Sequence, residues 1–204
     1  MSGQPAIARG TAGVDRPDFT ILTQWHLDAT PDELSAIALT PELLHVWCPR
    51  VFLTSEMVER GAADGLGMVV RLHSKGLLPH SFFFVAEVVD VIPERYMRLQ
   101  VTGDFDGFGD LYVEPDPDGG CRARLVWTVN IGHPYVRYFM RILHPVFVWN
   151  HKWAVRWARK LMQAEVHRRR VGTHQFTRKG ATFPHNLPFV RAWQVRRSAR
   201  RGWS

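Results

Sequence analysis

Cysteine and long apolar runs are both scarce in this chain of 204 residues. Its two cysteines, Cys48 and Cys121, belong to no Cys-x-x-Cys or Cys/His cluster, which excludes a disulfide framework and a zinc site. The most aromatic stretch, residues 135–157, is interrupted every few positions by a charged side chain or a histidine, so no membrane span is expected. The N-terminal residues contain no apolar run of signal-peptide length. The sequence therefore predicts a cytoplasmic protein without a metal site.

Acidic residues are missing from the end of the chain. Residues 1–167 carry 16 Lys and Arg against 19 Asp and Glu, whereas residues 168–204 carry ten basic residues and no acidic one. The net charge of +7 thus describes a mildly acidic body with a basic tail. Such a tail either binds an anionic surface or is a solvated, flexible extension. Because the body shows no nucleic-acid-binding fold, a membrane is the favoured partner of residues 168–204 and nucleic acid is not expected.

Composition divides the chain into three parts. Residues 1–17 are rich in Gly, Pro, Ser and Thr and predict a disordered leader. One globular domain is expected over residues 18–170, because the chain is too short for two large domains. Residues 171–204, rich in Gly, Pro, Arg and Ser, predict a basic, flexible tail.

The spacing of apolar residues predicts the order of elements. A strand over residues 19–27 precedes two helix starts of the same form, Thr30-Pro31 with Glu33, and Thr40-Pro41. From residue 51 the apolar period becomes two, which predicts strands over residues 51–59, 68–74, 80–92, 96–102, 108–114 and 122–131. The connections between them are too short for parallel crossovers, so we expect an antiparallel meander.

A helix is expected to cover this sheet. Residues 135–143 predict a short helix and residues 146–169 a long one, with Pro145 kinking or breaking the chain between them. Phe147, Asn150, Trp157 and Leu161 recur at helical spacing and form a mainly apolar stripe, while basic side chains lie opposite. The residues thus predict an α+β fold in which about seven antiparallel strands pack on a long C-terminal helix.

The element order and four local phrases carry a family resemblance. The phrases are PELLHVWCP (41–49), VVDVIPERYMRLQVTGDFDGFGDLYVEP (88–115), LVWTVNI (125–131) and FVWNHKWAV (147–155). Over residues 18–168 the sequence resembles the START-like superfamily, also called SRPBCC or helix-grip, and its bacterial polyketide cyclase/dehydrase branch. The resemblance implies a curved sheet wrapped around the long helix, with a cavity between them for a hydrophobic or amphipathic small molecule. The Cys/His cluster of Rieske oxygenase subunits is absent, so we expect no cofactor.

Residues expected to face this cavity are the candidate ligand-binding residues. Most of them would be ordinary core, with two or three contacting a ligand. Asn150 stands out because a buried amide on the apolar stripe must find a partner. It either orients a ligand or bonds to the backbone at the helix kink. The candidates are Trp47, Phe84, Leu99, Trp127, Phe147, Asn150 and Trp153.

Standard catalytic motifs are absent, including GxSxG, the phosphate-binding loop and HExxH. The candidates for catalysis are therefore single polar residues: Asn150, Asp104 and Glu87. Asp104, like its neighbour Asp106, is either a general acid or base at the cavity mouth or a turn former beside glycine. Glu87 either points inward, towards a partner such as Arg71, or lies on the solvent face.

Three functions are compatible with these patterns. We prefer the binding of a lipid or polyketide-like molecule in the cavity. The second is a cyclase or dehydratase reaction on a polyketide-like substrate. The third is a lipid-handling module that its basic tail brings to anionic membranes, which would make a cytoplasmic protein peripheral to the membrane.

Overall fold

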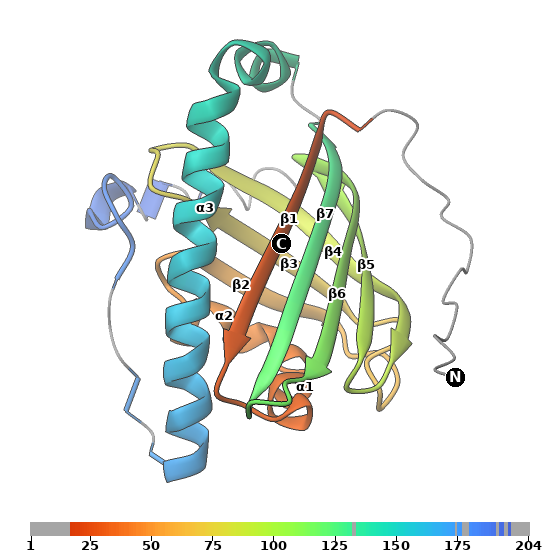
Figure 1. Ribbon diagram of the computed structural model, residues 1–204. Coiled ribbons are helices and arrows are strands. Elements are labelled where there is room, and N and C mark those ends of the chain that lie inside the picture. Colours follow the sequence, from red (N-terminus) through yellow and green to blue (C-terminus); the bar gives the residue numbers. More distant parts are fainter. Residues whose placement is uncertain are drawn as a thin grey trace.

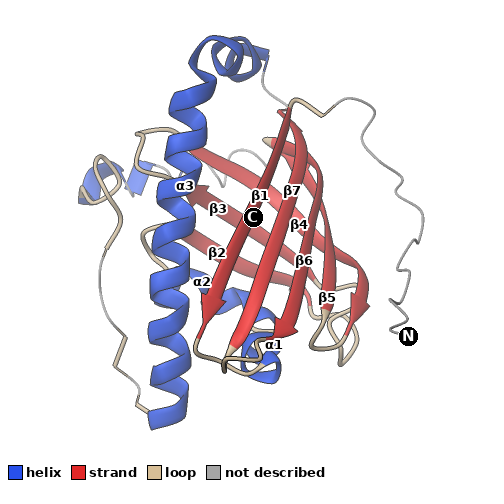
Figure 2. Ribbon diagram, viewed as in Figure 1, coloured by secondary structure: helices blue, strands red, loops and turns tan. Residues whose placement is uncertain are grey.

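The computed structural model of the protein describes residues 17–131, 134–173, 175–176, 180–190, 192–193 and 196, and gives only the backbone of residues 134–144. Residues 1–16, most of the expected leader, lie outside the described residues, as do most of residues 191–204. A curved antiparallel sheet lies against one long helix (Figure 1, Figure 2). This arrangement confirms the expected helix-grip α+β fold.

Seven strands form the sheet in the order β1-β7-β6-β5-β4-β3-β2, and all neighbours are antiparallel. Strands β2 to β7 therefore make the expected meander, and β1 closes the far edge against β7. The strands are β1 (Phe19–Leu27), β2 (Phe52–Glu59), β3 (Val69–Lys75), β4 (Ser81–Ile92), β5 (Tyr96–Gly103), β6 (Phe105–Pro115) and β7 (Cys121–Ile131).

Side chains alternate between the two faces of each strand, as a period of two requires. In β7, Ala123 and Val129 are buried, whereas Arg122 and Arg124 are exposed. In β5, Val101 is fully buried between exposed neighbours. The apolar face predicted from the sequence is thus the inner face of the sheet, towards the helix.

A helical connection joins the two edge strands, β1 and β2, and spans one end of the sheet (Figure 1). It consists of α1 (Pro31–Ala38), the 3-10 turn η1 (Pro41–Leu43) and α2 (Leu44–Trp47). The expected capping box starts α1: the Glu33 amide donates to Thr30 Oγ1 (3.3 Å), and the Thr30 amide donates to Glu33 Oε2 (2.8 Å). Leu34, Ile37 and Trp47 anchor this connection in the core.

The long helix α3 (Pro134–Val171) is continuous through Pro145, so of the two expected outcomes the kink occurs and the break does not. Its first turns are bent away from the rest of the helix (Figure 1). A proline inside a helix removes one hydrogen bond and clashes with the preceding turn, which bends the helix without ending it when the flanking turns are otherwise intact.

Strand β6 begins three residues earlier than its sequence indicates, at Phe105. Asp106 and Gly107, which read as turn residues, pair instead with Asn130 and Val129 of β7. A Cβ atom at position 107 would lie 2.2 Å from the Thr128 carbonyl oxygen, so glycine is required here by close approach of the strands. The glycine that suggests a turn therefore serves strand packing.

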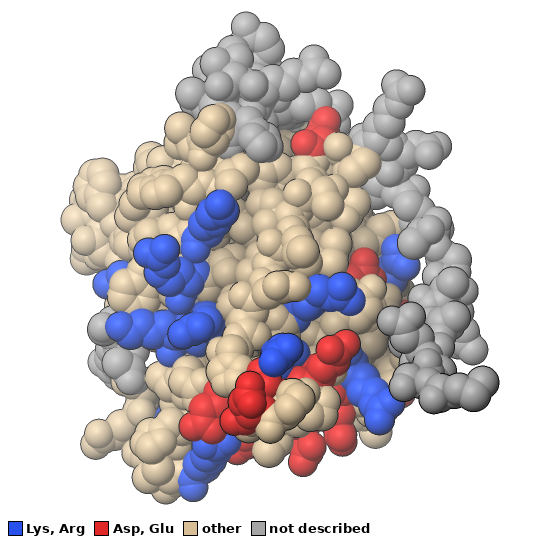
Figure 3. Space-filling model, in the orientation of Figure 1, with Lys and Arg blue, Asp and Glu red and all other residues tan. Residues whose placement is uncertain are grey.

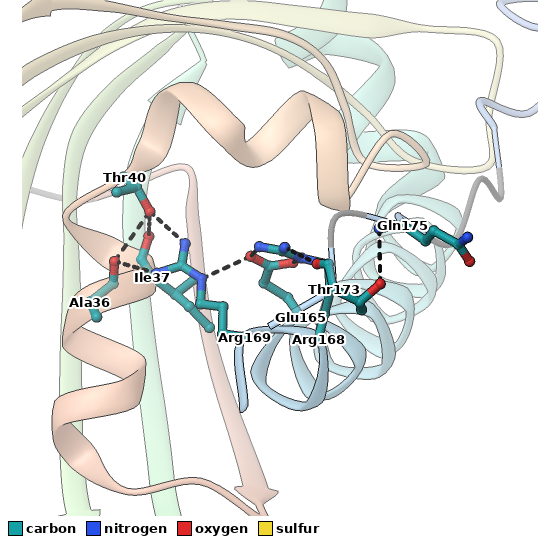
Figure 4. A network of polar contacts seen from close by, with 8 residues as sticks. All are labelled: Ala36, Ile37, Thr40, Glu165, Arg168, Arg169, Thr173 and Gln175. Atoms are coloured by element: carbon teal, nitrogen blue, oxygen red, sulfur yellow. Dashed lines mark hydrogen bonds and ion pairs between the residues drawn. The ribbon is translucent and has the colours of Figure 1, made fainter. Parts of the chain in front are cut away.

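A buried ion-pair network fixes the C-terminal end of α3 (Figure 4). Glu165, only 2% exposed, accepts hydrogen bonds from Arg168 (2.6 and 2.7 Å) and from Arg169 (2.8 Å). Burial raises the pKa of Glu165, but the two arginines outweigh this effect and hold the pKa below its usual value. Arg169 also donates to the Ala36 carbonyl (2.9 Å) and to Thr40 Oγ1 (2.7 Å), which ties α3 to the end of α1.

Part of the tail packs against Lys75, the last residue of β3. Lys75, only 2% exposed, donates three hydrogen bonds of 3.1 Å, to the carbonyls of Thr182 and Phe183 and to Nδ1 of His185. His185 is itself buried, as is Ala181. The sequence suggests a flexible tail, but residues 181–185 are held because the Lys75 ammonium lies under them and needs their acceptors.

Candidate functional site

Two adjoining cavities lie between the inner face of the sheet and the helices. The first, about 200 Å³, is enclosed by α1 and strands β3 to β6. The second, about 300 Å³, lies between α3 and the aromatic side chains of strands β4, β6 and β7. Four side chains line both cavities: Trp25, Leu44, Trp47 and Met162. The cavities therefore meet at these four residues, which we call the partition, and together they have the size of a ligand pocket.

Six of the seven candidate ligand-binding residues line these cavities. Leu99 lines the first cavity, Trp47 lines both, and the second is lined by Phe84, Trp127, Phe147 and Asn150. Trp153 lines neither cavity. Its ring packs against that of Trp157, with 6.1 Å between the centroids, because its position on α3 turns it away from the sheet.

Aromatic rings dominate the second cavity. Phe105 lies 4.5 Å from Phe82, 5.6 Å from Phe84 and 6.1 Å from Trp127, measured between ring centroids. The Trp127 ring covers Gly109, where a Cβ atom would lie 2.7 Å from Trp127 Cζ3. These rings form a stiff apolar wall made largely of edge-to-face contacts. Phe105 is not among the sequence candidates because its neighbours Asp104, Asp106 and Gly107 indicate a turn.

Trp25 is a further wall residue that the candidates omit. It lies in β1 at an inner position, and the alternation of that strand, with exposed residues at positions 20, 22, 24 and 26, would have identified it. Met162 carries no comparable signal, because a methionine on the apolar stripe of a helix is ordinary core.

Asn150 makes a hydrogen bond to the backbone. Its Oδ1 accepts from the Leu78 amide at 3.0 Å, in the loop between β3 and β4, and the residue is 8% exposed. Gly76 of the same loop passes so close that a Cβ atom there would lie 2.3 Å from Asn150 Oδ1. The amide therefore fixes this loop against α3, at a distance from the bend at Pro145.

The carboxylates considered for catalysis lie outside both cavity walls. Asp104 closes the turn between β5 and β6: its Oδ2 accepts from the Phe83 amide, and its own amide donates to the Phe83 carbonyl, both at 2.8 Å. Asp106 and Glu87 are exposed, and Arg71 pairs with Glu56 at 3.3 Å. Glu87 therefore marks the solvent face of β4.

Three buried ring nitrogens in the cavity walls have no hydrogen-bond partner among the described residues. They are Nε1 of Trp25, Nε1 of Trp47 and Nε2 of His151. Burial lowers the pKa of His151 to about 4, so its ring is neutral at physiological pH. A buried polar group without a partner is unfavourable by about 1–3 kcal/mol. Among the described residues, two buried N–H donors and one neutral imidazole of the wall residues thus lack a partner.

Tyr96 and Lys75 are wall residues that already have partners. The Tyr96 hydroxyl donates to Asp110 Oδ1 at 2.7 Å, and burial together with this bond raises the pKa of Tyr96. Burial lowers the pKa of Lys75 to about 8.

The described residues contain no group of three potential metal ligands. None of the described helices has an apolar stretch sufficient for a membrane span.

Comparison with known proteins agrees with this geometry. Residues 19–170 match a family described as "Polyketide cyclase / dehydrase and lipid transport". Among curated proteins, none matches the sequence significantly. A structure from Thermus thermophilus aligns with a TM-score of 0.58 at 18% identity, covering 72% of this chain and 98% of its own. A START superfamily protein from Mycobacterium smegmatis aligns with a TM-score of 0.57 at 15% identity, covering 73% and 97%.

Proposed function

The chain belongs to the polyketide cyclase/dehydrase and lipid transport family, and we propose that it binds a lipid or polyketide-like molecule in its two adjoining cavities. The observation that carries this proposal is the apolar space itself: two cavities of about 200 and 300 Å³ that share Trp25, Leu44, Trp47 and Met162 in their walls. Displacing water from such walls favours a largely hydrophobic ligand.

The unpartnered indole groups favour a ligand that carries an oxygen acceptor. Trp25 and Trp47 stand in the partition, and each holds a buried N–H without an acceptor among the described residues. A carbonyl, ester or ether oxygen placed between the cavities would satisfy one or both donors. The proposed ligand is thus a hydrophobic chain or ring system with at least one oxygen near its middle.

The residues proposed for catalysis do not support a cyclase or dehydratase reaction. Neither Asp104 nor Glu87 lines a cavity, and the Asn150 carbonyl oxygen is already engaged by the Leu78 amide. General acid or base catalysis needs a titratable group within hydrogen-bond reach of the substrate. Of the three residues proposed for catalysis, none offers such a group to the cavities.

Filling the second cavity tests the proposal. Ala154 of α3 lines this cavity, so Ala154→Phe should occupy part of it and weaken the binding of a fluorescent fatty acid by at least about tenfold. Ala36→Phe is the matched control, because Ala36 is exposed on α1. Mass spectrometry of organic extracts of the native protein should find a co-purified hydrophobic molecule. Equal binding by the two variants, with no extracted ligand, would contradict the proposal.

A further inference from the structure

Four cations lie on the outer face of α3. Lys152, Arg156, Arg159 and Lys160 are all exposed and recur at intervals of three and four residues, which places them on one face of the helix. No ion pair links any of the four to a carboxylate among the described residues. Figure 3 shows basic groups over the middle of α3, while acidic groups in this view gather lower, towards α1.

The basic run at the end of α3 is different. Arg168 and Arg169 pair with the buried Glu165, and Arg170 pairs with Glu33 at 2.7 Å. These three guanidinium groups hold the domain together, so their charge is largely neutralised within the protein. Among the described residues, the cationic surface therefore lies on α3 and not at the beginning of the basic tail.

Exposed apolar side chains extend the cationic face at its N-terminal end. Trp149, 52% exposed, shares the helical face of the cations, and Val146, 39% exposed, lies at the edge of that face. Trp157 lies on the edge of the same face, under the guanidinium of Arg50, which is 3.9 Å from the ring centroid. A helix face that combines tryptophan, aliphatic residues and several cations is typical of proteins that lie on a lipid surface.

We propose that the outer face of α3, from Val146 to Lys160, docks on an anionic membrane. A lipid surface offers both the negative charge that the four cations match and an interfacial layer for Trp149 and Val146. This face is the convex side of one helix, whereas single-stranded nucleic acid is bound in a groove that follows its backbone. The proposal does not depend on cavity binding, although Phe147 and Ala154 on the opposite side of this segment line the second cavity.

Vesicle co-sedimentation of the full chain tests the proposal. The protein should bind vesicles of phosphatidylcholine with phosphatidylserine, bind phosphatidylcholine alone much more weakly, and dissociate as salt is added. The double variant K152Q/R156Q should lower the partition coefficient by about tenfold or more, because each cation near an anionic surface contributes a several-fold factor. W149S should lower it further.

The matched control is R60Q/R124Q, which removes the same charge from two exposed positions, one directly after β2 and one on β7. It should leave the partition coefficient within about twofold of the wild-type value, because salt screens charges that lie far from the membrane contact. An equal loss in both double variants would show that only net charge matters and would overturn the proposal. It would also be overturned by the absence of vesicle binding at low salt, or by a polynucleotide that binds through the same residues in preference to vesicles.

Discussion

His151 is neutral in the folded protein because burial lowers its pKa to about 4. In the unfolded chain the imidazole takes up a proton below about pH 6.5, so the unfolded state binds more protons and stability falls as pH decreases towards 4. Between about pH 7 and pH 5 this residue alone should lower the free energy of unfolding by about 2 kcal/mol. Urea denaturation at the two pH values should show that His151→Gln removes this loss.

The control for that experiment is His167→Gln, which removes an exposed histidine from the same helix. An identical pH dependence in the wild type and His151→Gln would mean that the ring is solvated. Burial also lowers the pKa of His73, to about 3, so part of the acid sensitivity should persist in the His151 variant. The quantity to compare is therefore the difference in pH dependence between the wild type and His151→Gln.

Individual wall residues could be predicted where a simple period applies. Leu99 lies between Arg98 and Gln100, and strand alternation alone places it inside. The orientation of Trp153 could not be predicted, because Ala154 beside it fits the apolar stripe equally well and is the residue that lines the cavity. The partner of Asn150 comes from a loop, whose path no sequence period describes.

At the scale of elements, the end of α3 depends on one buried carboxylate. Glu165 accepts all of its hydrogen bonds from Arg168 and Arg169, and these arginines reach the Thr173 carbonyl and α1 in turn. Glu165→Gln should lower the free energy of unfolding by about 2–4 kcal/mol, because it leaves two partly buried guanidinium groups without a counter-charge. Thermal and urea denaturation would measure the change.

Glu87→Gln provides the comparison, since Glu87 is exposed on β4 and its loss should change stability by no more than about 0.5 kcal/mol. Equal stability of the two variants would show that the network contributes little. The sequence did not reveal Glu165, because a glutamate followed by three arginines near a helix end is usually a solvated pattern. Its burial depends on tertiary packing, with Trp47 of α2 and Phe176 lying around it.

The order and type of elements were largely predictable, and the errors have physical causes. The period of two and the short connections determine a meander whatever the tertiary contacts. The start of β6 and the continuity of α3 could not be predicted from the sequence. Gly107 is compatible with either a turn or a close contact between strands, and Pro145 with either a helix break or a bend. Tertiary context decides between these possibilities.

At the scale of the whole molecule, the tail segment and the domain are joined through Lys75. The ammonium of Lys75 lies beneath residues 182–185 and gives them three hydrogen bonds, so the segment and the sheet bury each other's polar groups. Composition predicts a flexible extension because arginine, glycine and proline dominate it. Composition contains no information about a contact with one buried lysine some hundred residues earlier in the chain.

Lys75→Ala should therefore release this segment without unfolding the domain. The amides of His185 and Leu187 donate to the carbonyls of Thr182 and Pro184 at 3.0 and 3.1 Å, and their hydrogen exchange reports whether the segment keeps its structure. Each lost hydrogen bond from a charged donor is worth about 1.5–3 kcal/mol, so exchange at these amides should accelerate by at least about tenfold. Lys152→Ala, on the exposed face of α3, should leave it unchanged. Unaltered exchange in Lys75→Ala would mean that apolar contacts alone hold the segment, and that the lysine only fills the space beneath it.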